Sequence, residues 1–208
     1  MTVEVVTEED APPLVRVFAN RFRLSLQRPQ SQDLVSSLET VFSLKSTKNA
    51  QAVTITVSKG KLELTHGVAP NSDIVVSMDF DNPKASTHMS GQWRHPFAAY
   101  RVGKLLSLPL PNWADSAKRF WAMTCNEPNV PAKVTITCTD EDRSLSFGEG
   151  ETATEIIGRS AVLEDVLAGN TLMLHLVIGG KLRYRGTMEH LAGLSQAGQK
   201  IMLGELHG

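Results

Sequence analysis

The sequence has few of the residues that usually reveal a protein's chemistry. It contains two cysteines, Cys125 and Cys138, which are too few for a disulfide framework or a four-cysteine metal site. Aromatic residues make up only 6% of the chain, and no apolar run approaches the roughly 18 residues that a membrane span needs. The N-terminal region turns acidic at Glu8-Glu9-Asp10, which is unlike a signal peptide. These absences predict no transmembrane segment, and we expect a cytoplasmic location.

The chain also lacks an excess of charge of either sign. Its 21 Lys and Arg residues are balanced by 22 Asp and Glu residues, and they form no basic block. This distribution argues against a nucleic-acid partner. A nucleophile motif of the G-x-S-x-G type is missing, and the glycine-containing segment 148–151 is acidic, which would repel a phosphate. We therefore predict no catalytic residue and no cofactor.

What the sequence does contain is an approximate internal repeat. The matching segments are, in pairs, 52–56 with 132–137, 73–75 with 155–157, 89–91 with 167–169, and 103–105 with 180–182. The spacing drifts only from about 81 to about 77 residues, as small loop changes between two copies would produce. A chain of 208 residues is long enough for two domains of roughly 100 residues each. We therefore predict a first unit over 1–111 and a second over 112–208.

Hydrophobic periodicity predicts a mixture of helices and strands in each unit. In the first unit we expect helices over 14–26, 31–42 and 82–91, a further short helix near Pro96, and strands over 52–57, 61–65, 74–80 and 105–110. Arg16, Arg21 and Arg23 should lie on the polar side of the first helix. In the second unit we expect helices over 113–123, 162–167 and 188–203, and strands within 134–147, 154–159 and 182–185. This order predicts an internally duplicated α+β fold with an antiparallel or mixed sheet covered by helices.

The order of these signals resembles the sterol carrier protein type 2 family. The segments that carry the resemblance are a hairpin, a strand opening with an acidic residue, a short helix ending in a small residue and glycine, and a Gly-Lys-Leu followed by an amphipathic helix. The match is best in the second copy, over Leu167-Ala168-Gly169 and from Gly179 to Gly186. The first copy has Pro109 where the second has Gly186.

The resemblance implies a five-stranded sheet with helices over one face, enclosing an apolar tunnel for sterols, fatty acyl chains or other lipids. It implies no universal catalytic residue. We therefore predict the binding or transfer of a hydrophobic small molecule in an apolar cavity. Flexible and aromatic side chains suit such a cavity. The candidates are Phe18, Phe22, Trp93, Phe97, Tyr100, Phe120, Trp121, Met173 and Met188, all of which also suit an ordinary core.

Two other functions stay open at this point. The chain is alternatively an enzyme or accessory protein that acts on a hydrophobic metabolite in the same cavity, with His88, His95, Tyr100 or Asp79 as acid or base. It is also consistent with a dimerisation module whose cavities are filled. His88 and His95 could bind a metal with Asp79 or Asp81, but their spacing matches no metal motif, and we predict no metal. Transient membrane contact remains open, and the sequence predicts no oligomeric state.

Overall fold

The computed structural model describes residues 3–27, 29–80, 87–108, 110–150 and 154–206. The chain divides into two compact units, Met1–Pro109 (the first unit) and Leu110–Gly208 (the second unit). Each unit has its own sheet and its own hydrophobic core. The fold is mixed α+β, and this part of the predicted fold class is confirmed.

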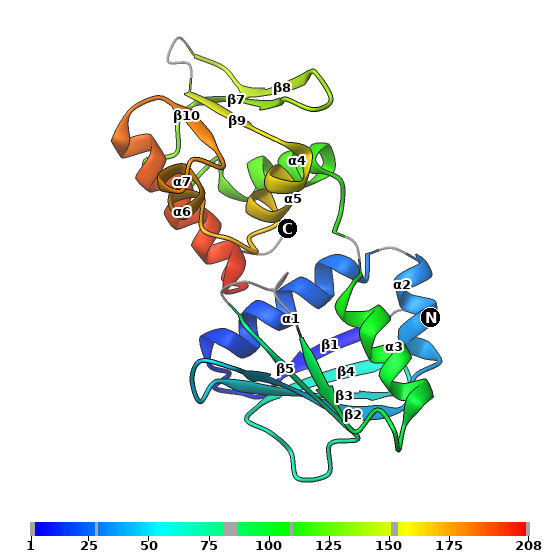
Figure 1. Ribbon diagram of the computed structural model, residues 1–208. Helices are drawn as coiled ribbons and strands as arrows, with labels where there is room; N and C mark the ends of the chain where they lie inside the picture. Colours follow the sequence, from blue (N-terminus) through cyan, green and yellow to red (C-terminus); the bar gives the residue numbers. More distant parts are fainter. Residues whose placement is uncertain (1–2, 28, 81–86, 109, 151–153, 207–208) are drawn as a thin grey trace. The chain divides into compact units, whose positions relative to one another are not determined.

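The first unit is built on a six-stranded sheet. Its elements are β1 (Glu4–Thr7), α1 (Pro13–Ser25), α2 (Pro29–Ser36), β2 (Thr40–Ser46), β3 (Ala52–Ser58), β4 (Lys61–His66), β5 (Ile74–Met78), β6 (His88–Ser90) and α3 (Pro96–Leu106). The strand order is β1-β4-β3-β2-β5-β6. The pairs β1·β4 and β2·β5 are parallel, and the other pairs are antiparallel. Helices α1 and α3 lie on the same face of this sheet (Figure 1).

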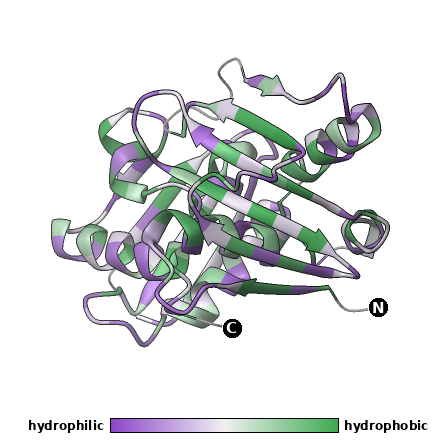
Figure 2. Ribbon diagram, turned by 90° about the horizontal axis from the view of Figure 1, so that it is seen from below, coloured by the Kyte–Doolittle hydropathy of each residue, from purple (hydrophilic) through white to green (hydrophobic). Residues whose placement is uncertain are grey.

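The core of the first unit lies between this sheet face and the helices. Alternate residues of a strand point to opposite faces, so Val53, Ile55 and Val57 of β3 are buried together against the helices. Figure 2 shows the resulting alternation of hydrophobic and hydrophilic bands along the strands. Pro13 starts α1 because a first-turn amide needs no intrahelical partner.

A buried polar network holds the loop 67–72 to the sheet. The Thr54 hydroxyl donates to the carbonyl oxygen of Gly67 at 2.8 Å and accepts from the amide of Ala69 at 2.9 Å. The Ser43 hydroxyl lies 2.8 Å from that of Thr54 and 2.6 Å from that of Ser72. These bonds satisfy polar groups that burial would otherwise penalise.

The second unit is built on a four-stranded sheet. Its elements are α4 (Trp113–Thr124), β7 (Lys133–Cys138), β8 (Arg143–Gly148), β9 (Thr154–Gly158), α5 (Ser160–Leu167), α6 (Met173–Ile178), β10 (Arg183–Arg185) and α7 (Met188–Met202). The strand order is β10-β9-β7-β8, with β7·β9 parallel and the other two pairs antiparallel. The six-stranded and four-stranded sheets correct the expectation of five strands in each copy.

Hydrogen bonds to Asp140 link the end of β7 to the start of α5. Its carboxylate accepts from the Ser160 amide at 2.8 Å, the Ser160 hydroxyl at 2.7 Å and the Cys138 thiol at 3.0 Å. The thiol and hydroxyl hydrogen bonds from Cys138 and Ser160 hold the pKa of Asp140 well below its usual range. Burial, followed by the hydrogen bond to Asp140, raises the pKa of the Cys138 thiol.

Three predicted elements of the first unit are wrong. The helix expected over 31–42 ends at Ser36, and the alternating segment Thr40–Ser46 forms β2 instead. A strand was expected over 105–110, but residues 105–106 belong to the end of α3. Val102 and Leu105 are buried on one face of that helix. Of the helix expected over 82–91, residues 88–90 form β6 and residues 82–86 lie outside the described residues.

The two sheets share one pattern of pairing, and the sequence repeat agrees with it in aligning β5 with β9 but not in aligning β7. In the first sheet β2 pairs antiparallel with β3 and parallel with β5, which pairs antiparallel with β6. In the second sheet β7, β8, β9 and β10 repeat these pairings in the same order. By pairing, β7 corresponds to β2, whereas the repeat aligned it with β3. Gly91 and Gly186 follow the last strand of each set, both at positive φ.

Two glycines of α7 should respond oppositely to alanine. A Cβ at Gly193 would lie 2.3 Å from the carbonyl oxygen of Asn129, whereas one at Gly198 would meet only Phe120 at 3.8 Å. We expect Gly193→Ala to lower the free energy of unfolding by about 1–3 kcal/mol through this overlap. Gly198→Ala should raise it by about 0.5–1 kcal/mol through helix propensity. Urea denaturation measures both, and equal effects would contradict the packing of α7.

The Asp140 contacts predict a pH-dependent contribution to stability. Because the folded-state pKa is depressed, the contribution is fully present above the unfolded-state pKa and is lost as pH falls through the folded-state pKa. Asp140→Asn should therefore lower the free energy of unfolding at neutral pH, and the difference from the parent protein should shrink as the solution is acidified below the ordinary carboxyl range. Denaturation curves over this pH range check it; a difference that does not vary with pH would contradict the assignment.

Candidate functional site

The first unit contains a cavity of about 190 Å³ between α1, β5, β6 and α3. Its lining residues are Phe18, Arg21, Phe22, Val76, Met78, Thr87, Met89, Gly103, Leu106 and Ser107. The spacing of Phe18, Arg21 and Phe22 places all three on one face of α1. Gly103, Leu106 and Ser107 share a face of α3 for the same reason. Two helices and the edge of the sheet thus border the space, which is partly open to solvent.

The walls of this cavity are mostly apolar. Phe18 and Phe22 are buried, and the Phe18 ring meets the Phe80 ring edge-on at 5.5 Å between centroids. Met78 and Met89 supply flexible, polarizable side chains that adapt to irregular contents. A cavity with this lining favours an apolar occupant.

Arg21 is the one ionisable residue among those that line the cavity. Its side chain is partly exposed, and within the described ranges it forms no ion pair or hydrogen bond. A guanidinium presents a fork of donors that fits a carboxylate or phosphate. The cavity therefore combines an apolar space with one cationic group.

The size of the cavity limits what fits inside it. A buried apolar cavity of about 150 Å³ holds a single benzene ring. Pockets for drug-sized ligands span roughly 300–1,000 Å³. At about 190 Å³ the cavity lies much nearer the first value. It matches one alkyl chain of short to medium length or one ring.

Of the residues predicted to bind ligand, Phe18 and Phe22 line this cavity. Trp93, Phe97 and Tyr100 are instead exposed, by 93%, 85% and 63% of their surfaces. Trp93 lies in the turn before Pro96, outside the core. Phe97 and Tyr100 lie on the side of α3 opposite its buried face. These three aromatics do not line the cavity between α1 and α3, and Trp93 lines a separate open depression with Gln92, Pro96 and Ala99.

The predicted residues of the second unit have other positions. Phe120 and Met173 are fully packed in its core. Trp121 is half-buried and stacks on Phe147, with ring centroids 6.1 Å apart. Met188 is 71% exposed at the start of α7.

Sequence reasoning missed several residues of the cavity. Arg21 was expected on the polar side of its helix, yet it lies within one turn of both Phe18 and Phe22 and lines the cavity with them. That spacing is visible in the sequence. Met89 had no such signal, because its position depends on β6, which the sequence does not predict.

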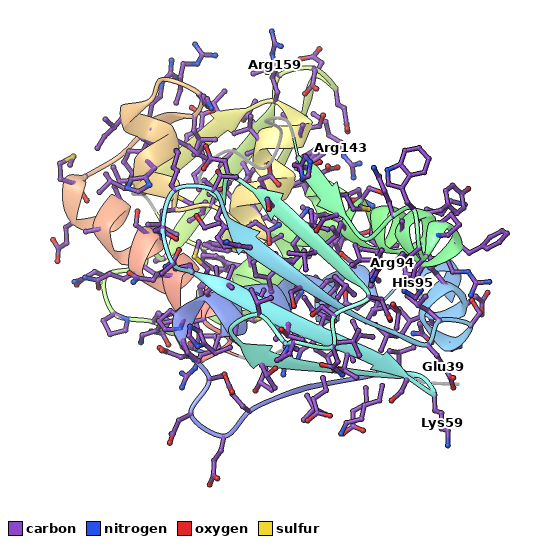
Figure 3. All side chains as sticks on the ribbon, turned by 60° about the horizontal axis from the view of Figure 1, so that its bottom comes forward. Glu39, Lys59, Arg94, His95, Arg143 and Arg159 are labelled. Carbon is purple, nitrogen blue, oxygen red and sulfur yellow. The ribbon has the colours of Figure 1, made fainter. Side chains whose placement is uncertain are left out.

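The acid–base candidates do not assemble into a catalytic group. His95 Nε2 lies 3.9 Å from Asp73 Oδ1, beyond hydrogen-bonding distance. Figure 3 shows His95 beside Arg94 where the chain enters α3. The Ser90 hydroxyl in the same shallow polar depression donates to the Val75 carbonyl oxygen at 3.2 Å. Asp79 forms an ion pair with Lys48 at 2.9 Å.

Neither a metal cluster nor a membrane-spanning helix occurs in the part of the chain that the structure describes. No three His, Cys, Asp or Glu side chains there are grouped so that they could hold a metal ion. No helix there is long and apolar enough to cross a bilayer. Asp81, which the sequence suggested as a metal ligand, lies outside the described residues.

The positions of the aromatic residues predict a clear difference in stability. Trp93→Ala and Phe97→Ala remove exposed side chains and should change the free energy of unfolding by no more than about 0.5 kcal/mol. Phe120→Ala empties a buried site and should cost about 3–5 kcal/mol. Urea denaturation distinguishes these cases. A loss of several kcal/mol for Trp93→Ala would show that its indole is buried.

Comparisons with known proteins add one weak likeness. No protein-family model and no curated protein matches the chain. The solution structure of a conserved hypothetical protein of Thermus thermophilus, suggested to be a sterol carrier protein, matches with 13% identity and a TM-score of 0.22, covering 93% of this chain and 87% of that one. At this TM-score the likeness carries no argument about fold or function.

Proposed function

We propose that the first unit binds a small, apolar molecule with an anionic end in the cavity between α1, β5, β6 and α3. The observation that carries the proposal is the lining of this cavity, in which Arg21 is the one ionisable group among apolar walls. Removing apolar surface from water supplies the affinity, at roughly 25 cal/mol per Å² before the entropic cost of binding. The guanidinium fixes which end of the ligand faces outward.

The size of the cavity narrows the ligand class. One medium-length acyl chain enters a space of about 190 Å³ more easily than a rigid four-ring sterol. The side chains of Met78 and Met89 let the walls adjust to chains of somewhat different length. A medium-chain carboxylate is therefore the ligand class that we favour, with binding or transfer rather than chemical change as the function.

The sequence resemblance to sterol carrier proteins supports the same function, since that family is expected to hold lipids in an apolar space. The pairing pattern shared by β2, β3, β5 and β6 with β7, β8, β9 and β10 supports the idea that both units derive from one such unit. The second unit would then have kept the pattern while Phe120 and Met173 fill its core.

Octanoate and octanol test the proposal because they share a chain and differ in charge. We expect octanoate to bind the full chain, as measured by isothermal titration calorimetry. Gly103→Leu should abolish binding of both probes, because its side chain can enter the cavity from α3, where no atom lies within 4 Å of the added Cβ. Gly103→Ala is the matched control, and it should retain most of the affinity.

The Arg21→Gln variant tests the cationic group of the site separately from its apolar cavity. Loss of the charge should weaken octanoate binding about tenfold, which is the size of one charge-assisted hydrogen bond, and should leave octanol nearly unaffected. Octanoate binding that is unchanged in both the Gly103→Leu and Arg21→Gln variants would show that the ligand binds elsewhere. Absence of binding by both probes would contradict the proposed function.

A further inference from the structure

A surface made of the turn before α3 and the outward face of α3 is rich in exposed aromatic and basic side chains. Its members are Trp93, Arg94, Phe97, Tyr100, Arg101 and Lys104, and we call it the aromatic–basic surface. Phe97, Tyr100, Arg101 and Lys104 share one side of the helix because they are spaced by three, four and seven residues. Ala99, Val102 and Leu105 on the other side are buried.

The exposure of this surface is unusual for its residue types. Trp93 and Phe97 present almost their whole side chains to solvent, although burying such rings is strongly favourable. Their exposure has no explanation in the packing of the described residues. A contiguous exposed apolar patch commonly marks a surface that binds a partner or a membrane.

The charged residues of this segment of the chain are all basic. From position 88 to position 112 the sequence contains no Asp or Glu, whereas Arg94, Arg101 and Lys104 are cationic. Lys104 Nζ lies 4.7 Å from the centre of the Tyr100 ring, and Arg101 donates to the Ser37 carbonyl oxygen. The Asp73 carboxylate lies beside His95 and also accepts hydrogen bonds from Thr40 and Val41, and the exposed Glu39 follows Ser37 by two residues.

We infer that the aromatic–basic surface docks on an anionic lipid bilayer. Trp and Tyr prefer the headgroup region, where one part of the ring is apolar and another is wet. Lys and Arg beside them are attracted to the negative surface of anionic lipids. An exposed Trp and Phe on a segment whose charged residues are all basic match this interface better than a protein surface of mixed charge. The inference rests on this surface and is independent of whether the cavity holds a ligand.

Co-sedimentation with vesicles tests the inference on the full chain. We expect binding to vesicles of mixed phosphatidylcholine and phosphatidylserine, weaker binding to pure phosphatidylcholine, and loss of binding at high salt because exposed charges are screened. Trp93→Ala and Phe97→Ala should each reduce binding severalfold. Ile178→Ala, which removes an apolar side chain that is 77% exposed in the second unit, is the matched control and should have no effect.

Substitutions of the basic residues test the electrostatic part of vesicle binding. Arg94→Gln and Lys104→Gln should each weaken binding to the anionic vesicles about fivefold, the usual contribution of one cation near such a surface. Arg159→Gln removes an exposed cation from the second unit and should leave binding unchanged. Circular dichroism confirms that all variants remain folded.

A second readout reports contact of the indole itself. Insertion of Trp93 into the headgroup region should shift the tryptophan emission to shorter wavelength, and Trp93→Phe should abolish the shift. Absence of vesicle binding would overturn the inference. So would binding that persists in Trp93→Ala and Arg94→Gln, or self-association through this surface, detected by light scattering, without any binding to vesicles.

Discussion

The packing of α1 and α3 on one face of the first sheet is the interaction on which the proposed site depends. Val15, Phe22 and Val102 are buried there with the strand residues of the first core. Each helix buries an apolar stripe in the core that covers this sheet. Gly103 has no side chain to fill the space between them, and that space is left open as the cavity.

Helix α3 connects the two proposed activities of the first unit. Leu106 and Ser107, at its end, line the cavity, while Phe97 and Lys104 lie on its outward face. A helix that contacts a bilayer on one side and a ligand cavity on the other would bring the cavity close to a source of acyl chains. Membrane contact and ligand uptake would then be coupled through one element, without any large rearrangement of the sheet.

Much of the secondary structure could be predicted from the sequence, because hydrophobic periodicity depends on local spacing. The helix beginning at Trp113, the strands from Ala52 and Lys61, and the final helix from Met188 all occur where the pattern indicates them. The segment Thr40–Ser46 was mispredicted because Val41 and Phe42 also continue the helical spacing from Leu34 and Leu38. Only pairing with β3 and β5 favours the strand, and such pairing is not visible in local sequence.

The site was harder to predict than the elements, because a cavity has no sequence motif. An aromatic side chain favours burial in general, and the sequence alone does not show that Trp93 and Phe97 remain exposed. Arg21 was assigned to solvent by its charge, although its spacing from Phe18 and Phe22 placed it at the border of the apolar face. The residues that complete the cavity come from β5, β6 and α3, which are distant from α1 in sequence and meet only in the fold.

The most direct test of the central claim is a titration of methyl-labelled methionine with octanoate, followed by nuclear magnetic resonance. The seven methionines include two in the cavity, Met78 and Met89, and others in the second unit, such as Met173 and Met202. Binding in the cavity predicts saturable shifts of the Met78 and Met89 methyl signals, with those of Met173 and Met202 unchanged. Unshifted Met78 and Met89 signals, or saturable shifts confined to the second unit, would contradict it.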